Sequence, residues 1–364
     1  MRPAVFLILL IFLVPLNLEA QTEKQSFLGG RILDALTQEP IPHVEVFVSE
    51  TTSGCISDAH GYFKLKIPYL PCTIVARHVS YKSRIQAINS YKNLDIQLKP
   101  ADNKIAEVGI VGKNKRKRNL RFFLDQFIPD SRRKIKVLND SVLFFERDEM
   151  KFRAYTRQPL LIENEILGYR ISLLLEEFEV VASDGPAGRP LPLNSIKGGY
   201  IKQLTGHYFY ESLENEFPDQ KEYYQYNRQE IYYGSYRHFL KSVYDGDTGN
   251  QGFQIDVFDA ADTIAFHQLA QNESGNKQMV IRADSLKVHY YHMDDRTPVP
   301  LEYLESFNYI HTTTSTIYPT PFPFWIRPNG TSPKLSFVID GLLVNKSFAN
   351  SLPKDYIPTR KKLK

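Results

Sequence analysis

The fold of the first part of the chain is decided by Gly29-Gly30-Arg31-Ile32-Leu33, which runs directly into Asp34-Ala35-Leu36-Thr37-Gln38-Glu39-Pro40. The first segment predicts a short strand, and the second, which is rich in residues that interrupt strands, predicts a turn. Val44-Glu45-Val46-Phe47-Val48 then alternates with a period of two, as a half-buried strand does. A tight hairpin turn is expected over residues 57–63, where Gly61 can adopt a positive φ.

Further strands are expected over residues 63–67, 72–79 and 94–98, and this spacing indicates a β-sandwich over residues 27–100. The order of these residues resembles the carboxypeptidase regulatory-like module, a transthyretin-like or immunoglobulin-like β-sandwich of exported and outer-membrane-associated bacterial proteins. The matching residues are Gly30, Asp34, Ala35, Thr37, Pro40, Pro42, Val44, Val46, Asp58, Gly61 and Phe63. Val79-Ser80-Tyr81 also matches, although Ser80 stands where the family usually has glycine. The resemblance implies an accessory domain without peptidase chemistry, in which Asp58 caps the turn.

The first twenty residues have the features of a secretion signal. Arg2 supplies a positive charge, residues 4–14 are an unbroken apolar run, Pro15 interrupts it, and Ala20 is a small residue before Gln21. The apolar run is too short to span a bilayer, and no later segment is apolar enough to span one as a helix. We therefore predict export to the periplasm, outer membrane or cell surface; a short membrane anchor is the alternative.

The composition is that of an ordinary folded protein. Of 364 residues, 42% are hydrophobic and 24% are charged, and the length predicts about two domains. The 22 tyrosines and 23 phenylalanines favour strands. A net charge of +4 is too small for a dedicated nucleic-acid binder. Cys55 and Cys72 are the only cysteines; the exported setting permits a disulfide between them, and free buried thiols are the equal alternative.

The predicted organisation is a mainly β fold in two domains with a few helices. It runs in the order signal peptide 1–20, β-sandwich 27–100, basic linker 101–119, larger β-rich domain 120–358 and basic tail 359–364. The linker carries most of the basic run Lys113, Lys115, Arg116, Lys117, Arg118 and Arg121, and a solvated hinge is favoured over contact with anionic lipid or polymer. Leu120, Phe123, Leu124 and Phe127 then recur at helical spacing, which predicts a helix ending at Pro129.

The rest of the second domain is predicted to be mostly strands. Strands are expected over residues 142–145, 152–155, 169–181, 279–281, 286–291 and 335–339, with a strand pair over 198–210. Residues 159–164 are expected to form a connector, and one helix is expected around Ile231 to Val243, with Gly246 as its stop signal. These segments resemble larger exported proteins that join this module to a β-rich domain of no established activity.

No catalytic or metal-binding sequence pattern is present. His-Glu-x-x-His, Gly-x-Ser-x-Gly and glycine-rich phosphate loops are missing, so we predict no metal and no cofactor. His289 and His292 would point to opposite faces of a strand and could not share one ion. Glu177 and Glu179 would share a face, but spacing along a strand cannot show the opposed pair that a glycosidase needs.

Three side chains on the expected helix are candidates for ligand binding: Arg228, Arg237 and His238. In a cleft they would bind an acidic group. The favoured interpretation is structural, with the cations paired to carboxylates such as Glu222 or Glu230.

Taken together, these features predict a non-enzymatic cell-envelope or surface protein that binds or scaffolds an envelope protein or a surface polymer. Peripheral association with the outer membrane is compatible with this prediction, and a nucleic-acid partner is not. One alternative is a hydrolase with an unrecognised site in the second domain. A further alternative is a component associated with an outer-membrane receptor.

Overall fold

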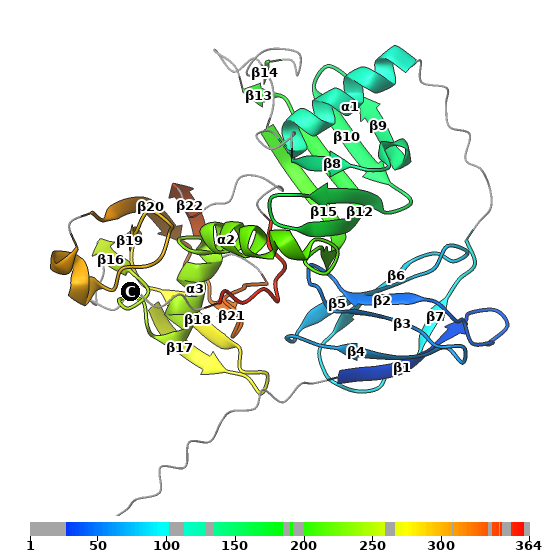
Figure 1. The fold of residues 1–364 in the computed structure, drawn as a ribbon, viewed down its shortest axis with the longest axis horizontal. Coiled ribbons are helices and arrows are strands. Elements are labelled where there is room, and N and C mark those ends of the chain that lie inside the picture. The colour runs from blue at the N-terminus through cyan, green and yellow to red at the C-terminus, as the bar shows by residue number, and fades with distance from the viewer. Residues whose placement is uncertain are drawn as a thin grey trace, which may run out of the picture.

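The structure is a computed structural model that describes residues 27–101, 113–128, 134–184, 190–191, 200–258, 266–307, 309–333, 337–341, 343 and 351–359. The predicted signal peptide and nearly all of the basic tail lie outside these residues. The described part is mainly β, with several sheets and few helices, as predicted (Figure 1). No helix in the described ranges combines the length and the apolar character that crossing a bilayer requires.

The N-terminal part is a sandwich of two sheets, as predicted. Its strands are β1 (Phe27–Asp34), β2 (Glu45–Val48), β3 (Gly54–Ile56), β4 (Tyr62–Lys66), β5 (Cys72–Arg77), β6 (Arg84–Ile88) and β7 (Ile96–Leu98). One sheet has the order β4-β1-β7 and the other the order β3-β2-β5-β6. Alternate residues of both sheets, such as Leu28, Ile32, Val46 and Leu65, are fully buried between them. The period-two pattern in the sequence is therefore the pattern of the core.

The turn over residues 57–63 carries the chain from one sheet to the other, so the hairpin predicted there is wrong. It joins β3 of the four-stranded sheet to β4 of the three-stranded sheet. Gly61 has φ +75°, and a Cβ atom there would lie 2.5 Å from the carbonyl oxygen of Ile32. The Asp58 carboxylate accepts hydrogen bonds from the backbone amides of His60 (2.8 Å) and Tyr62 (2.9 Å). The predicted role of Asp58 as a turn cap is confirmed.

A second core lies between helix α1 and a long sheet. The sheet has the order β8-β11-β12-β10-β9, and β15 also pairs with β12. The elements are α1 (Lys113–Phe127), β8 (Ile135–Val137), η1 (Asp140–Val142), β9 (Leu143–Arg147), β10 (Lys151–Thr156), β11 (Leu160–Asn164), β12 (Tyr169–Val181) and β15 (Tyr200–Ser212). Phe123 and Phe127 of α1 pack edge-on against Phe178 of β12, with ring centres 5.1 and 5.8 Å apart. A small pair, β13 (Ser183–Asp184) and β14 (Pro190–Leu191), adjoins this region.

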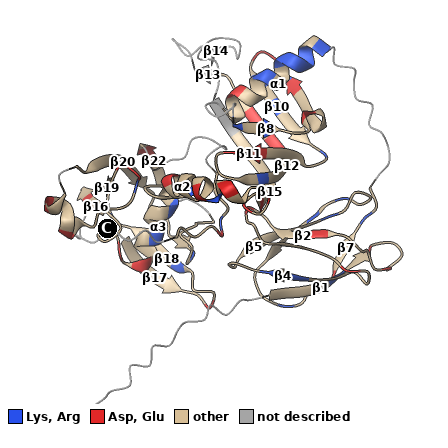
Figure 2. Ribbon diagram, in the orientation of Figure 1, with Lys and Arg blue, Asp and Glu red and all other residues tan. Residues whose placement is uncertain are grey.

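Three expectations for this region are corrected. Residues 160–164 form strand β11 rather than a connector, and residues 200–212 form one long strand rather than a pair. Helix α1 begins at Lys113, so the basic run belongs to the helix and not to a linker (Figure 2). Arg116 is held there because its guanidinium donates to the carbonyl oxygens of Leu143 (3.0 Å) and Asp140 (2.7 Å).

The third core is formed by two helices and two sheets. The sheets have the orders β16-β19-β20-β22 and β17-β18-β21. The elements are η3 (Pro218–Gln220), α2 (Lys221–Tyr232), α3 (Tyr236–Asp245), β16 (Phe253–Phe258), β17 (Phe266–Gln271), β18 (Lys277–Ile281), β19 (Ser285–His292), η4 (Leu301–Ser306), β20 (His311–Pro319), β21 (Phe324–Ile326) and β22 (Phe337–Gly341). Its buried side chains form a separate cluster, so the region predicted as one β-rich domain contains two hydrophobic cores.

The single predicted helix around residues 231–243 is two helices. Gly234 has φ +72° and lies between α2 and α3, and the hydroxyl of Ser235 caps α3 by accepting from the backbone amide of His238 at 3.2 Å. Gly246 has φ +70° at the C-terminal end of α3, which confirms it as the stop signal. Because the helix is interrupted at Gly234, the side chains of α3 point in other directions than they would on one continuous helix.

The sandwich is joined to the rest of the chain at the loop after β2. The backbone amide of Glu50 donates to the carbonyl of Tyr208 at 2.7 Å, and the amide of Tyr210 donates to the carbonyl of Thr51 at 3.0 Å. The ring of Phe47 packs on Phe209, with centres 5.1 Å apart. These contacts attach the four-stranded sheet of the sandwich to strand β15, while the three-stranded sheet lies on the far side of the sandwich (Figure 1).

The C-terminal segment 351–359 contacts all three cores. Its Lys354 amide donates to the Glu50 carbonyl at 2.7 Å, and the hydroxyls of Ser351 and Tyr210 are 2.8 Å apart. Arg237 of α3 donates to the Pro353 carbonyl at 2.7 Å. Because one short segment is bonded to each part, the three cores form one connected body.

Candidate functional site

Arg228 on α2 is a buried structural side chain. Its Nε donates to the Leu167 carbonyl at 2.6 Å and its Nη2 to the Gly168 carbonyl at 2.9 Å, while Nη1 pairs with Glu214. The guanidinium also lies 3.9 Å from the centre of the Tyr169 ring. All three nitrogens are therefore engaged, and the partner carboxylate is Glu214 rather than the expected glutamates of the helix.

Arg237 on α3 is bonded to backbone and not to carboxylates. Its guanidinium donates to the carbonyl oxygens of Asn329 (3.1 Å), Pro353 (2.7 Å) and Tyr356. Burial lowers the pKa of Arg237, and the surrounding carbonyl dipoles take the place of a counter-ion. Its role is to hold the C-terminal segment against α3.

His238 is 2% exposed and is surrounded by aromatic rings. Its Nδ1 accepts from the amide of Gly234 at 3.1 Å, and its Nε2 donates to the side-chain oxygen of Gln251 at 3.1 Å. Burial lowers the pKa of His238 to about 4, so the ring is neutral at physiological pH. The three predicted residues thus serve three separate structural contacts.

The two cysteines are free thiols, which was one of the two sequence-based alternatives. Cys55 is on β3 and Cys72 is on β5, and β2 lies between these strands in the sheet. Two strand spacings amount to about 10 Å, which is beyond the reach of a disulfide. Burial raises the pKa of each thiol to about 11.

The other titratable clusters are paired with neighbours. Arg153 Nε donates to Glu177 at 2.8 Å and lies 3.9 Å from Glu179, which confirms that the two carboxylates share a face. His289 bonds to Asp256 at 3.1 Å, whereas His292 is directed to the Met293 carbonyl at 2.7 Å on the opposite face of β19. Among the described residues, no three potential metal ligands come together.

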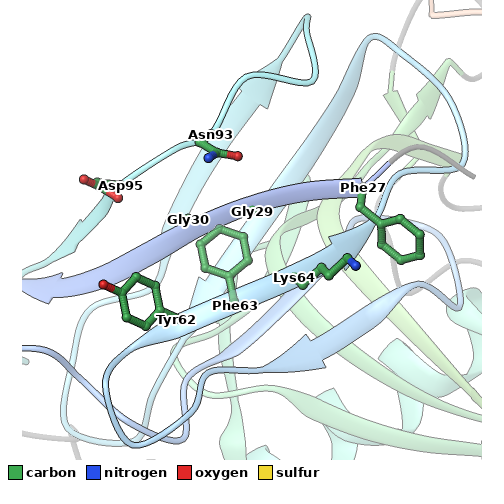
Figure 3. Close-up of a pocket in the computed structure, with 8 residues that line it drawn as sticks. All are labelled: Phe27, Gly29, Gly30, Tyr62, Phe63, Lys64, Asn93 and Asp95. Atoms are coloured by element: carbon green, nitrogen blue, oxygen red, sulfur yellow. The ribbon is translucent and has the colours of Figure 1, made fainter.

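A groove lies on the outer face of the three-stranded sheet, beside Gly29. It has a volume of about 480 Å³ and opens to solvent (Figure 3). The lining residues come from β1, from β4 and from the segment before β7, and they are Phe27, Gly29, Gly30, Tyr62, Phe63, Lys64, Asn93 and Asp95. Gly29 pairs with Lys64 in the register of β1 and β4. Because Gly29 has no side chain, the sheet face is hollow at this point.

Two partly exposed aromatic side chains flank the hollow. Phe27 is 41% exposed and Tyr62 is 54% exposed. A cation accompanies each ring: Lys64 Nζ is 4.6 Å from the centre of the Phe27 ring, and the Arg31 guanidinium is 5.1 Å from that of Tyr62. The groove thus combines exposed ring surface with ammonium, amide and carboxylate groups, and this mixture is typical of a ligand site.

The groove residues were not predicted as a site. The signal available in the sequence is the pair Gly29-Gly30 inside a strand, since glycine in a strand often marks a close approach of another segment. Gly30 fits that description, because a Cβ atom there would lie 1.8 Å from the Leu94 carbonyl oxygen. Gly29 differs, because its nearest neighbour would be the flexible end of Asn93 at 3.2 Å.

A second hollow of about 370 Å³ lies beside α2. It is lined by Lys134, Glu163, Glu165, Leu213, Phe217, Gln220, Tyr223 and Tyr224. Its charged groups are already partnered: Lys134 donates to the Tyr223 hydroxyl at 2.9 Å, and Glu165 pairs with Lys136. The groove beside Gly29 is the larger of these two hollows and is the better candidate site.

Comparison with known proteins identifies the first domain. Residues 28–110 match the CarboxypepD_reg-like domain family. Among curated proteins, no relative of the chain was found. A mutant type II cohesin–X-dockerin complex from Acetivibrio cellulolyticus is 20% identical, over 26% of this chain and 72% of that chain, with a TM-score of 0.19.

Two Bacteroides structures match more of the chain but at lower identity. A protein from Bacteroides uniformis, provisionally named carbohydrate binding, is 12% identical over 53% of this chain and 81% of that one, with a TM-score of 0.18. A protein from Bacteroides fragilis, provisionally named membrane-associated and of unknown function, is 9% identical over 52% of this chain and 99% of that one, with a TM-score of 0.18. These similarities are too distant to support a function. The family match, in contrast, confirms the sequence-based resemblance: the chain has an N-terminal CarboxypepD_reg-like domain over residues 28–110, followed by a further β-rich region.

Proposed function

We propose that the protein is a non-enzymatic binding and scaffolding protein of the cell envelope, and that the groove beside Gly29 is its ligand site. The observation that carries this proposal is the pair of partly exposed rings, Phe27 and Tyr62, on either side of a hollow in the sheet. Exposed aromatic side chains grouped around a depression are a common feature of binding surfaces. The envelope location rests on the predicted signal peptide.

The two sheets of the sandwich have different surroundings, and this difference supports the groove as the ligand site. The four-stranded sheet is covered: Phe47 packs on Phe209, and Arg77 Nη1 donates to the Ser172 hydroxyl at 2.7 Å. The three-stranded sheet carries the groove on its solvent-exposed outer face. One sheet therefore anchors the domain to the β-rich region, and the other presents the groove to solvent.

The scaffolding part of the proposal rests on the contacts of the β-rich region. Arg228, Arg237 and His238, which were the candidates for recognition there, connect helices α2 and α3 to neighbouring backbone and side chains. Such contacts fix the relative positions of the parts of the chain. We therefore propose that the β-rich region is a rigid support for the domain that carries the groove.

The proposal is tested by co-sedimentation of the exported full chain with envelopes of the cells that express it. We expect the wild-type chain to sediment with the envelope and Gly29→Gln to do so much less, because a long side chain at Gly29 fills the hollow. Tyr309→Ala is the matched control, since Tyr309 is 84% exposed and lies in a different part of the chain. Equal sedimentation of wild type and Gly29→Gln would show that the groove is not the ligand site.

A further inference from the structure

We infer that the ligand of the groove is a hydroxyl-rich saccharide chain. This inference rests on the proposed function of the groove as the ligand site and adds the chemical class of the ligand. Three properties of the groove support a saccharide: the backbone groups along its floor are already paired, its aromatic rings are spaced for an extended ligand, and its lining side chains include both charges and an amide.

The floor of the groove leaves little backbone for a peptide to pair with. On the side of β1 that faces β7, the Gly29 carbonyl accepts from the Leu94 amide at 3.0 Å, and the Arg31 amide donates to the Asp95 carboxylate at 3.2 Å. The other side of β1 is paired with β4. Recognition by addition of a β-strand needs a free row of backbone groups. A ligand that lies on this face of the sheet, over β1, must therefore be recognised mainly by side chains.

The aromatic side chains are spaced for an extended ligand. Tyr62 pairs with Arg31, which is four residues along β1 from Phe27. At about 3.3 Å per residue, the two side chains are separated by about 13 Å along the strand direction. A sugar ring presents a face of C–H groups with partial positive charge, and this face complements the negative face of an aromatic ring. A chain of a few sugar units could contact both rings at once.

The side chains that line the groove include a cation, an anion and an amide, and a second cation, Arg31, lies over the Tyr62 ring. Lys64 and Asp95 carry opposite charges, and the Asn93 side chain supplies both a donor and an acceptor. A purely apolar ligand would bury these groups without partners, which is unfavourable. A strongly anionic ligand would approach Asp95, and a strongly cationic one would approach Lys64. Hydroxyl groups, which both donate and accept, suit all three side chains.

The test uses the same envelopes after two separate treatments, with reagents removed before the protein is added. Periodate cleaves the carbon–carbon bond between neighbouring hydroxyl groups and so destroys most saccharides, whereas a broad-specificity protease digests exposed protein. We expect periodate to abolish co-sedimentation and the protease to leave it unchanged. Loss of binding after protease treatment with retention after periodate would overturn the saccharide assignment.

Variants of Tyr62 test the stacking contact directly. Tyr62→Phe keeps the ring and is expected to bind the envelope as the wild type does, whereas Tyr62→Ala is expected to weaken binding by up to about tenfold, the value of one lost ring contact. Tyr309→Ala remains the control. Equal binding by the wild type, Tyr62→Ala and Tyr62→Phe would overturn the stacking contact with the saccharide.

The two proposals fail in different ways. If Gly29→Gln binds like the wild type, the groove is not the ligand site and the proposed function fails. If Gly29→Gln weakens binding but only the protease abolishes it, the groove remains the ligand site and only the saccharide class is wrong.

Discussion

The guanidinium of Arg228 lies over the ring of Tyr169, with its central carbon 3.9 Å from the ring centre. The same guanidinium bonds to the carbonyls of Leu167 and Gly168, which form the turn before β12. A ring of Tyr224 closes the other side of that turn, because a Cβ atom on Gly168 would lie 2.3 Å from it. Arg228 and Tyr224 thus join helix α2 to the turn before β12.

Arg228→Lys is expected to lower the free energy of unfolding by about 2–4 kcal/mol, because a lysine cannot reproduce the planar set of donors and leaves buried carbonyls unpaired. Chemical denaturation followed by circular dichroism measures the change. Arg84→Lys is the matched control, since Arg84 is exposed on β6, and it is expected to change stability by less than about 0.5 kcal/mol. Similar values for the two variants would contradict the structural role of Arg228.

Asp355→Ala is expected to loosen the C-terminal segment from the sandwich. The Asp355 carboxylate accepts from the Thr52 amide at 3.0 Å and from the Thr52 hydroxyl at 2.7 Å. Loss of these bonds on the surface is expected to cost about 1–2 kcal/mol of local stability. Hydrogen exchange should therefore become faster at Thr52, while amides of β19 keep their rates. Glu273→Ala, at another exposed acidic residue, should leave the exchange of Thr52 unchanged.

The sandwich could be predicted because its turns and strands are indicated by residues that lie close together in the sequence. Asp58 and Gly61 determine the crossing between the sheets within a few residues of sequence, and alternation in residues 44–48 marks the buried face. Strand β6 was missed, because most of its residues are exposed or only partly buried and it shows no clear period. The break at Gly234 was missed because a single glycine inside a helical pattern does not by itself end a helix.

The candidate site depends on contacts between residues that are distant in sequence. The groove forms only because residues 93–95 return to Gly29, more than sixty positions earlier, and no local pattern indicates that approach. Arg237 illustrates the same limit. Its partners are backbone carbonyls of loops that follow it by about ninety residues or more, so a sequence that shows carboxylates nearby suggests the wrong partners.

The stability of the protein is expected to fall on acidification because His238 is buried as the neutral base. Its pKa is about 6.5 in the unfolded chain and about 4 in the folded one. Between these values the unfolded state binds the proton and the folded state does not. The contribution is therefore complete above about pH 6.5 and is lost as the pH falls towards 4, with a total of about 3 kcal/mol.

The contribution of His238 is isolated by comparing unfolding of the wild type and His238→Gln at pH 7 and pH 4.5. Carboxylates contribute equally to both proteins, so the difference between their pH profiles reports the histidine alone. We expect the profile of His238→Gln to be flatter. His60→Gln, at an exposed histidine, is the matched control for the loss of a histidine side chain. Parallel profiles for wild type and His238→Gln would rule out a buried neutral His238.

The thiols of Cys55 and Cys72 are expected to be free and slow to react. Burial raises the pKa of each to about 11, so little thiolate is present at neutral pH. Without reductant, a thiol reagent should label the folded chain slowly and should label two thiols per chain once the chain is unfolded. Fewer than two labelled thiols in the unfolded chain would indicate a disulfide. Cys72→Ala, which should show one thiol, calibrates the count.

The neighbouring glycines of β1 are expected to respond differently to the same substitution. Gly30→Ala would place a Cβ atom 1.8 Å from the Leu94 carbonyl oxygen, so the backbone of residues 93–95 must move. Overpacking of this kind is expected to cost about 1–3 kcal/mol or more. Gly29→Ala meets only the end of the Asn93 side chain at 3.2 Å, which can rotate away, so its effect on stability should be small.

Thermal unfolding of the two glycine variants therefore separates the fold from the site. Gly30→Ala should lower the melting temperature, because it displaces the segment that closes the groove. Gly29→Ala should melt like the wild type and should begin to fill the hollow between Phe27 and Tyr62. Equal destabilisation by both substitutions would mean that Gly29 is packed as tightly as Gly30. In that case the face of the sheet would have no open hollow at Gly29, and the groove could not admit a ligand there.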